Sequence, residues 1–193
     1  AAFIMIIIVI RIAPRALVAA GRINEVLETE PKVTDGTRDG NTGLRGEVEF
    51  RNVSFTYPGG SGAVLENISF TAHRGETVAF IGSTGSGKTS LVNLVPRFYD
   101  VTEGEVLVDG VNVKEYVLEE LYKKISYVPQ TSVMFSGTVK SNVLFGSHAR
   151  EERLEKALGI SMSEEFVDEI EDRENSEMAQ RGTNFYGGQK QRL

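Results

Sequence analysis

Residues 82–89 read Gly-Ser-Thr-Gly-Ser-Gly-Lys-Thr, which has the composition and spacing of a phosphate-binding loop. In such a loop, successive backbone N–H groups point inward at a polyphosphate. Glycine allows dihedral angles that other residues avoid and lets the backbone approach the phosphate oxygens closely. We expect Lys88 to neutralise the β- and γ-phosphates and the Thr89 hydroxyl to hold Mg²⁺. The predicted nucleotide-binding residues are Gly82, Ser83, Thr84, Gly85, Ser86, Gly87, Lys88, Thr89 and Ser90.

The residues around this loop suit the elements that must position it. Thr77–Ile81 is a short apolar run suited to a buried strand. After the loop, Leu91, Leu94 and Val95 fall at helical spacing until Pro96 ends the pattern. The sequence therefore predicts a strand, a glycine loop and a helix in that order, with the N-terminus of the helix at the anion site.

Composition limits the classes of function. The chain has 193 residues and a net charge of −6, and residues 151–180 hold 11 Asp and Glu against 3 Lys and Arg. This distribution excludes the clustered positive charge of a nucleic-acid interface and favours a solvated helical face. Because there is no cysteine, disulfides and thiolate metal sites are excluded.

The N-terminal segment is unusually apolar. Residues 1–10 carry no polar side chain, and Arg11, Arg15 and Arg22 follow them. Ten helical residues reach only about 15 Å of the roughly 30 Å hydrocarbon core. Residues 1–30 therefore resemble the cytosolic end of a last transmembrane helix and its extension, with arginines on the inside. The alternative is a buried core helix of a soluble domain, and Pro14 would kink either one.

A change of pattern separates this segment from a globular domain. The mixed helical pattern of residues 16–30 stops at Pro31, and residues 31–46 are rich in glycine and read as a linker. The globular domain is predicted at residues 47–193. Val48 and Phe50 alternate in one phase, and Val53 and Phe55 alternate in the other, which predicts a bulged strand.

The rest of the domain alternates strands and helices. Further strands are expected at residues 65–70, 105–109 and 125–128, and a helix at residues 117–124. Residues 150–174 read as helical, and Ser161 with Glu164 suggests a capping box.

Taken together, the motifs resemble those of ATP-binding cassette (ABC) exporters. Besides the glycine loop, which corresponds to the Walker A motif, the matching stretches are Phe55–Pro58, Gly104–Gly110, Tyr127–Gln130 and Asn184–Leu193. The resemblance runs through the whole chain. It implies an α/β P-loop core with an antiparallel β-subdomain and a helical subdomain, preceded by a membrane-exiting helix.

The resemblance also implies roles for single residues. Tyr57 would stack on adenine, and Gln130 would reach the Mg²⁺ shell and the attacking water as a catalytic residue. Tyr186, Gly187, Gly188 and Gln189 stand at the signature, which would face ATP bound by a partner. His73 and His148 match no catalytic histidine, so surface or capping roles are expected for both.

Two departures from the family pattern affect the expected activity. Tyr186 stands where the signature has serine, so a bulky phenol replaces a small hydroxyl. The sequence also stops at Leu193, before the Walker B strand and the switch histidine of the family pattern. We therefore expect this chain to bind ATP and Mg²⁺, whereas hydrolysis by the chain alone is not expected.

The implied parent protein is an ATP-driven exporter of the cell membrane. Its nucleotide-binding domain would lie on the cytoplasmic face, beside its own transmembrane domain and a second, non-identical ABC subunit, with no nucleic-acid partner. The alternatives are a soluble ABC-type ATPase clamp and a non-catalytic nucleotide-binding fragment.

Overall fold

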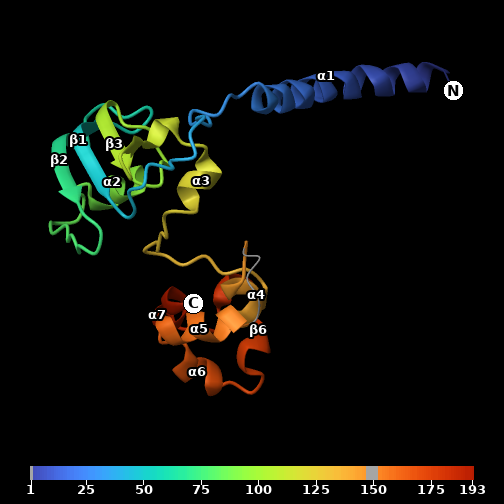
Figure 1. The fold of residues 1–193 in the computed structure, drawn as a ribbon. Coiled ribbons are helices and arrows are strands. Elements are labelled where there is room, and N and C mark those ends of the chain that lie inside the picture. Colours follow the sequence, from blue (N-terminus) through green and yellow to red (C-terminus); the bar gives the residue numbers. More distant parts are fainter. Residues whose placement is uncertain (1, 147–151) are drawn as a thin grey trace. The chain divides into compact units, whose positions relative to one another are not determined.

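The computed structural model describes residues 2–146 and 152–193, which form two compact units. The first unit ends at Ile125 and the second begins at Ser126. Figure 1 shows the long N-terminal helix and the sheet of the first unit in blue to yellow, and the helices of the second unit in orange and red. Each unit has its own cluster of buried apolar residues.

Helix α1 (Ala2–Leu27) is one helix of 26 residues with Pro14 inside it. The apolar start and the mixed pattern after Pro14 therefore belong to a single element. Apolar side chains along it are exposed, including Phe3 (83%) and Leu17 (73%). Within the described ranges, no helix combines the length and apolar character that crossing a bilayer requires. The membrane-helix interpretation of residues 1–30 stays a prediction.

An antiparallel sheet is the framework of the first unit. Its strand order is β2 (Leu65–Ala72), β1 (Val48–Phe55), β3 (Glu103–Val108) and β4 (Val111–Asn112). The predicted bulge in β1 is confirmed, because its register with β2 shifts between Phe50 and Val53. Asn52, at the bulge, has a φ of 47°. This shift is what allows Phe50, Val53 and Phe55 all to be buried.

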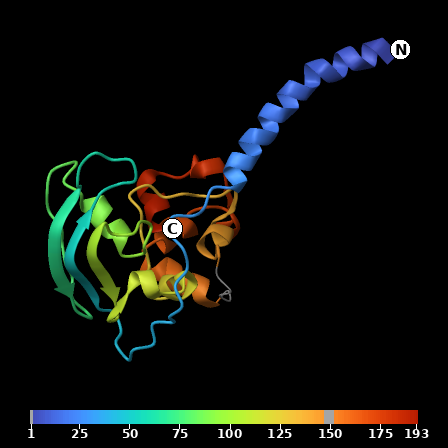
Figure 2. The same cartoon turned by 90° about the horizontal axis from the view of Figure 1, so that it is seen from above.

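Helix α2 (Lys88–Leu94) packs its apolar side against this sheet. Leu91 and Leu94 are buried in the same cluster as Phe50, Phe55 and Val106. Figure 2, seen from above, shows this short green helix on one side of the sheet. The sheet therefore fixes the position of the helix that follows the glycine loop.

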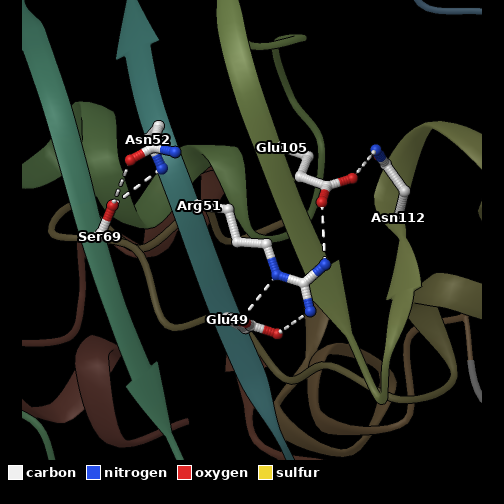
Figure 3. A network of polar contacts seen from close by, with 6 residues as sticks. All are labelled: Glu49, Arg51, Asn52, Ser69, Glu105 and Asn112. Carbon is white, nitrogen blue, oxygen red and sulfur yellow. Dashed lines mark hydrogen bonds and ion pairs between the residues drawn. The ribbon is translucent and has the colours of Figure 1, made fainter.

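The other face of the sheet carries a polar network (Figure 3). Arg51 donates hydrogen bonds to Glu49 at 2.7 Å and to Glu105 at 3.0 Å. Asn112 also donates to Glu105, and Ser69 donates to the Asn52 side chain. These hydrogen bonds lower the pKa of Glu49 and raise that of Arg51. Because Arg51 lies opposite Glu105 in the β1–β3 register, the network supports that register.

The segment predicted as a linker is held against the body of the first unit. We call residues 35–47 the strap. Its Gly36 and Arg38 N–H groups donate to the carbonyls of Tyr116 and Glu115 at 2.8 Å each, and Arg38 also forms an ion pair with Glu115. Asp35 accepts a hydrogen bond from the Leu118 N–H at 2.7 Å. These contacts lie around η1 (Val113–Glu115) and α3 (Leu118–Tyr122).

The strap is also bonded to Asp109, a carboxylate only 2% exposed. The Glu47 N–H and the Lys124 ammonium donate to this carboxylate at 3.1 and 2.8 Å. Burial alone would raise the pKa of Asp109, but these hydrogen bonds hold it below its ordinary value. Sequence periodicity gave no sign of this docking, because the strap bonds mainly through its backbone and polar side chains.

Two predicted strands are absent from the described residues. Thr77–Ile81 and the segment 125–128 are not in any strand, and Ile81 and Val128 are 95% and 72% exposed. A strand forms only where neighbouring backbones accept its hydrogen bonds, and no described segment pairs with either one. For these two segments the strand prediction was wrong. The predicted helix at 117–124 is confirmed as the shorter α3.

The second unit is mainly helical. It contains α4 (Val139–Val143), α5 (Glu152–Ile160), α6 (Glu164–Asp168) and α7 (Gly187–Arg192), with the turns η2 (Arg173–Asn175) and η3 (Gln180–Gly182). A small antiparallel pair joins β5 (Gly137–Thr138) to β6 (Glu177–Met178). Its core consists of Val139, Leu154, Leu158, Phe166, Val167 and Met178.

The acidic tract is helical, as predicted, but interrupted. A turn at Met162, with a φ of 55°, separates α5 from α6. The predicted capping box is wrong, because Ser163 precedes α6 and the Ser161 hydroxyl instead donates to the Leu158 carbonyl and the Ser163 hydroxyl. The start of the predicted tract, at residues 150 and 151, and His148 lie outside the described residues.

His73 lies on the surface of the first unit, as predicted, and forms an ion pair with Glu47 at 2.9 Å. The Glu47 carboxylate accepts a hydrogen bond from the His73 ring and raises the pKa of His73 above 6.5. We expect NMR titration of the imidazole to show this, and Glu47→Gln to return the pKa towards 6.5. Since the folded pKa exceeds the unfolded one, the pair stabilises the fold fully below pH 6.5 or so, and this contribution is lost as the pH rises through the folded pKa.

The assignment of that titration is direct, since the chain has only two histidines. His148→Gln removes the other imidazole resonance and leaves that of His73. A His73 pKa that is the same with and without the Glu47 carboxylate would contradict the prediction.

Candidate functional site

The glycine loop lies between the extended segment 77–81 and α2. Gly85 and Gly87 each have a φ of 85°, in the left-handed region that favours glycine. At Gly82, a Cβ would lie 2.6 Å from the Ser86 hydroxyl, so the serine side chain would have to move. At Gly87, a Cβ would also come within 2.9 Å of the Leu65 side chain. The conformation therefore favours glycine at Gly85 and Gly87, and the space around Gly82 favours it there.

Lys88 folds back into this loop. Its ammonium donates hydrogen bonds to the Gly82 carbonyl at 2.9 Å, the Ser83 carbonyl at 2.7 Å and the Ser86 hydroxyl at 3.2 Å. The lysine is the first residue of α2, so the helix fixes the position of its backbone. Oxygen atoms of the loop fix the position of its ammonium group. The result is a positive centre surrounded by a backbone loop with little side-chain bulk.

This arrangement fits a polyphosphate. Ser83, Thr84 and Thr89 are exposed, so their hydroxyls are accessible. The residues present are a lysine, hydroxyl groups and a close-approaching backbone, which is the donor set that phosphate oxygens require. Thr89 also offers the hard oxygen ligand that Mg²⁺ prefers. The loop can therefore hold a nucleoside triphosphate, and Thr89 can contribute one ligand to the Mg²⁺ ion bound with it.

Tyr57 lies close to the loop through a contact with α2. Its hydroxyl is hydrogen-bonded to the Ser90 hydroxyl at 2.8 Å, and Ser90 is only 6% exposed. The half-buried Tyr57 ring packs edge-to-face against Phe55 and Tyr99, with centroids 4.8 and 5.1 Å apart. The structure thus brings the predicted adenine-stacking residue together with the last residue of the predicted loop.

No pattern in the sequence indicates this contact. Tyr57, Ser90 and Tyr99 come from three separate stretches, and no periodicity relates them. The packing of Tyr99 against the Tyr57 ring was therefore not predicted.

The remaining predicted residues belong to the second unit. Gln130 is exposed and lies in a bend. Tyr186 is 81% exposed and directly precedes α7, which begins at Gly187. The Tyr186 N–H donates to the Gln189 side-chain oxygen at 2.9 Å, so the signature stretch has its own local structure. The catalytic and metal roles of Gln130, and the role of the signature in trans, stay predictions.

Comparison with known proteins identifies the relatives of this chain. Residues 65–193 match the sequence model of the family described as ABC transporter. An ABC transporter ATP-binding protein of Mycobacterium tuberculosis H37Rv is 43% identical over 198 residues, covering 100% of this chain and 34% of the relative. An ATP-dependent lipid A-core flippase of Pseudomonas fluorescens is 39% identical over 181 residues, covering 93% of this chain and 30% of the flippase.

A solved structure of an ABC exporter is also similar to this chain. A bacterial Atm1-family ABC exporter with ATP bound superposes with a TM-score of 0.84 at 29% identity, covering 96% of this chain and 33% of the exporter. The chain thus spans about a third of the length of these relatives. Its antiparallel sheet and helical unit agree with the predicted fold class. Because the family match covers more than half of the sequence, the chain belongs to the ABC transporter family and carries an exporter-type ATP-binding domain.

Proposed function

We propose that this domain binds Mg-ATP and couples ATP binding and hydrolysis to the export of a substrate across a membrane. The observation that supports this best is the Lys88 ammonium, held by three oxygen acceptors inside a glycine loop. A cation at this point is placed to neutralise phosphate charge, and no large side chain of the loop blocks the approach.

Each site residue then has a defined task. The backbone of residues 82–87 and Lys88 hold the β- and γ-phosphates, and Thr89 and Gln130 supply oxygens to Mg²⁺. Tyr57 offers a ring face to adenine, a contact worth about 1 to 3 kcal/mol by substitution. Mg²⁺ held by Thr89 and Gln130 would supply positive charge beside the phosphoryl oxygens, and Gln130 would orient the attacking water.

We further propose that residues 1–30 are the cytosolic end of a transmembrane helix. The apolar residues 1–10 would lie in the bilayer, and Arg11, Arg15 and Arg22 would lie on the cytoplasmic side. This orientation puts the ATP-binding domain on the cytoplasmic face of the cell membrane. Its own transmembrane domain would be the first partner.

Calorimetric titration of the chain tests the binding proposal. We expect saturable binding of about one ATP per chain in the presence of Mg²⁺, weaker binding in EDTA, and competition by tripolyphosphate. A folded chain that releases no heat with either Mg-ATP or Mg-tripolyphosphate would refute it.

The second subunit is proposed to differ from this one. An exposed Tyr186 puts a phenol ring where the family signature has a serine hydroxyl. Loss of one charge-assisted hydrogen bond of about 1.5 to 3 kcal/mol would slow turnover roughly ten- to a hundredfold if the bond acts in the transition state. In a homodimer both sites would be slow. A partner with an intact signature would instead pair with this chain's Lys88 and form one hydrolytic site.

Expression of the whole protein, alone and with a candidate partner subunit, tests the asymmetry. We expect ATPase activity only in the pair, and its loss on Lys88→Ala in this subunit. An active homodimer would overturn the proposal. The proposal would also be overturned by a pair in which Tyr186→Ser does not speed the ATP site that contains this signature, and Lys88→Ala does not lower the ATPase activity.

A further inference from the structure

The hydroxyl-to-hydroxyl contact between Tyr57 and Ser90 joins two parts of the proposed ATP site. The two residues are 33 positions apart, and the oxygen–oxygen distance is 2.8 Å. Tyr57 follows the end of β1, whereas Ser90 lies in the first turn of α2, two residues after Lys88. The bond therefore spans from the sheet to the helix that carries the phosphate-binding lysine.

Three contacts restrict the Tyr57 ring. Phe55 meets it at an interplanar angle of 73° and Tyr99 at 88°. Two edge-to-face contacts hold the body of the ring, and the hydroxyl is held at its far end. Because Ser90 is nearly fully buried within the core side of α2, it provides a rigid anchor.

The residues directly before and after Tyr57 line a cavity that Tyr57 itself does not line. Thr56 and Pro58 line this cavity of about 300 Å³ together with Phe98 and Tyr99. This cavity is the alternative place for a flat base near the loop. The bond to Ser90 is what commits the Tyr57 side chain to the side of α2.

We propose that Ser90 is a positioning residue that sets the distance and orientation of the Tyr57 ring relative to the phosphate loop. This proposal rests on the proposed ATP-binding function. A nucleotide has a fixed reach from base to phosphates, so a ring held at the matching distance binds it without first losing side-chain freedom. Ser90 is one of the nucleotide-binding residues predicted from the sequence, and here its contribution to Mg-ATP binding is assigned to its bond with Tyr57.

The experiment compares two ligands on a small set of variants. Mg-ATP reports on base and phosphates together, and Mg-tripolyphosphate reports on the phosphate loop alone. We expect Ser90→Ala and Tyr57→Phe each to weaken Mg-ATP binding about two- to tenfold, the scale of one neutral hydrogen bond. Tyr57→Phe should bind Mg-tripolyphosphate as the wild type does, and the double variant should be no weaker for Mg-ATP than Ser90→Ala alone.

Two further variants serve as controls. Tyr99→Phe removes a tyrosine hydroxyl beside the same ring while retaining its edge-to-face contact, and should leave Mg-ATP affinity unchanged. Ser90→Thr keeps a hydroxyl at the anchor and should retain most of the affinity. Circular dichroism of each variant establishes that it is folded.

The possible results separate the alternatives. Additive effects of Ser90→Ala and Tyr57→Phe, tighter Mg-ATP binding by Ser90→Ala, or loss of tripolyphosphate binding in Ser90→Ala alone would each overturn the positioning role. A loss of Mg-ATP affinity in Phe98→Ala with none in Tyr57→Phe would place the base in the neighbouring cavity instead. Absence of Mg-ATP and tripolyphosphate binding in the wild type would refute the ATP-binding function itself.

Discussion

Replacing Lys88 by alanine is expected to weaken Mg-ATP binding by about 1.5 to 3 kcal/mol, roughly ten- to 150-fold in Kd. The reason is that the ammonium is the charge centre of the loop, bonded to two carbonyls and one hydroxyl within 3.2 Å. Calorimetry on the wild type and the variant measures the change. The folded state should be affected much less, since the Gly82 and Ser83 carbonyls lie on exposed residues and can bond to water.

Lys123→Ala is the matched control for this experiment. It removes the same charge from the first unit, but Lys123 directly follows α3, is exposed, and forms ion pairs with Glu119 and Glu120 on the surface. Surface pairs of this kind contribute little, so its effect on Mg-ATP affinity should be small. Equal affinities for the wild type and Lys88→Ala would be incompatible with the proposed site.

Gly40→Ala is expected to destabilise the first unit by about 2 to 5 kcal/mol. Gly40 is buried with a φ of 68°, and a Cβ there would lie 2.0 Å from the Tyr116 ring. That ring is 0% exposed and its hydroxyl donates to the Val108 carbonyl at 2.8 Å, so it has no room to move. The cost combines a left-handed conformation with a methyl group forced into a packed site. Urea unfolding followed by tyrosine fluorescence measures it.

Gly43→Ala separates these two costs. Gly43 has a φ of 81°, but a Cβ there would meet nothing within 4 Å. Gly43→Ala should therefore lose only the stability cost of a left-handed backbone conformation, about 1 to 2 kcal/mol. Amide exchange at Gly36 and Arg38, whose N–H groups bond the strap to the body, should accelerate more in Gly40→Ala than in Gly43→Ala. Equal losses of stability in the two variants would mean that the strap does not pack on Tyr116 as described.

Several features of the fold were predictable because their causes are local. The bulge in β1 follows from the change of alternation between Phe50 and Val53, since a shift of one residue would otherwise turn Val53 away from the core. The helix after the glycine loop follows from the spacing of Leu91 and Leu94.

Other predictions depended on neighbours that local patterns do not specify. Thr77–Ile81 has the composition of a buried strand, yet it forms none, because a strand requires partner backbones and the described residues provide no pairing there. Ser161 and Glu164 have the spacing of a capping box, but α6 begins one residue after Ser163. The serine hydroxyls then bond to each other instead.

By itself, the sequence determined the glycine loop that is proposed to bind phosphate, because its glycines, lysine and threonine are contiguous and their conformations are local. The tertiary structure decided which distant groups meet that loop. The bond between Tyr57 and Ser90 and the docking of the strap on Tyr116 join residues 33 and more positions apart. Such contacts leave no periodic trace in the chain, because they depend on how the sheet places β1 beside α2 and not on the residues adjacent in sequence.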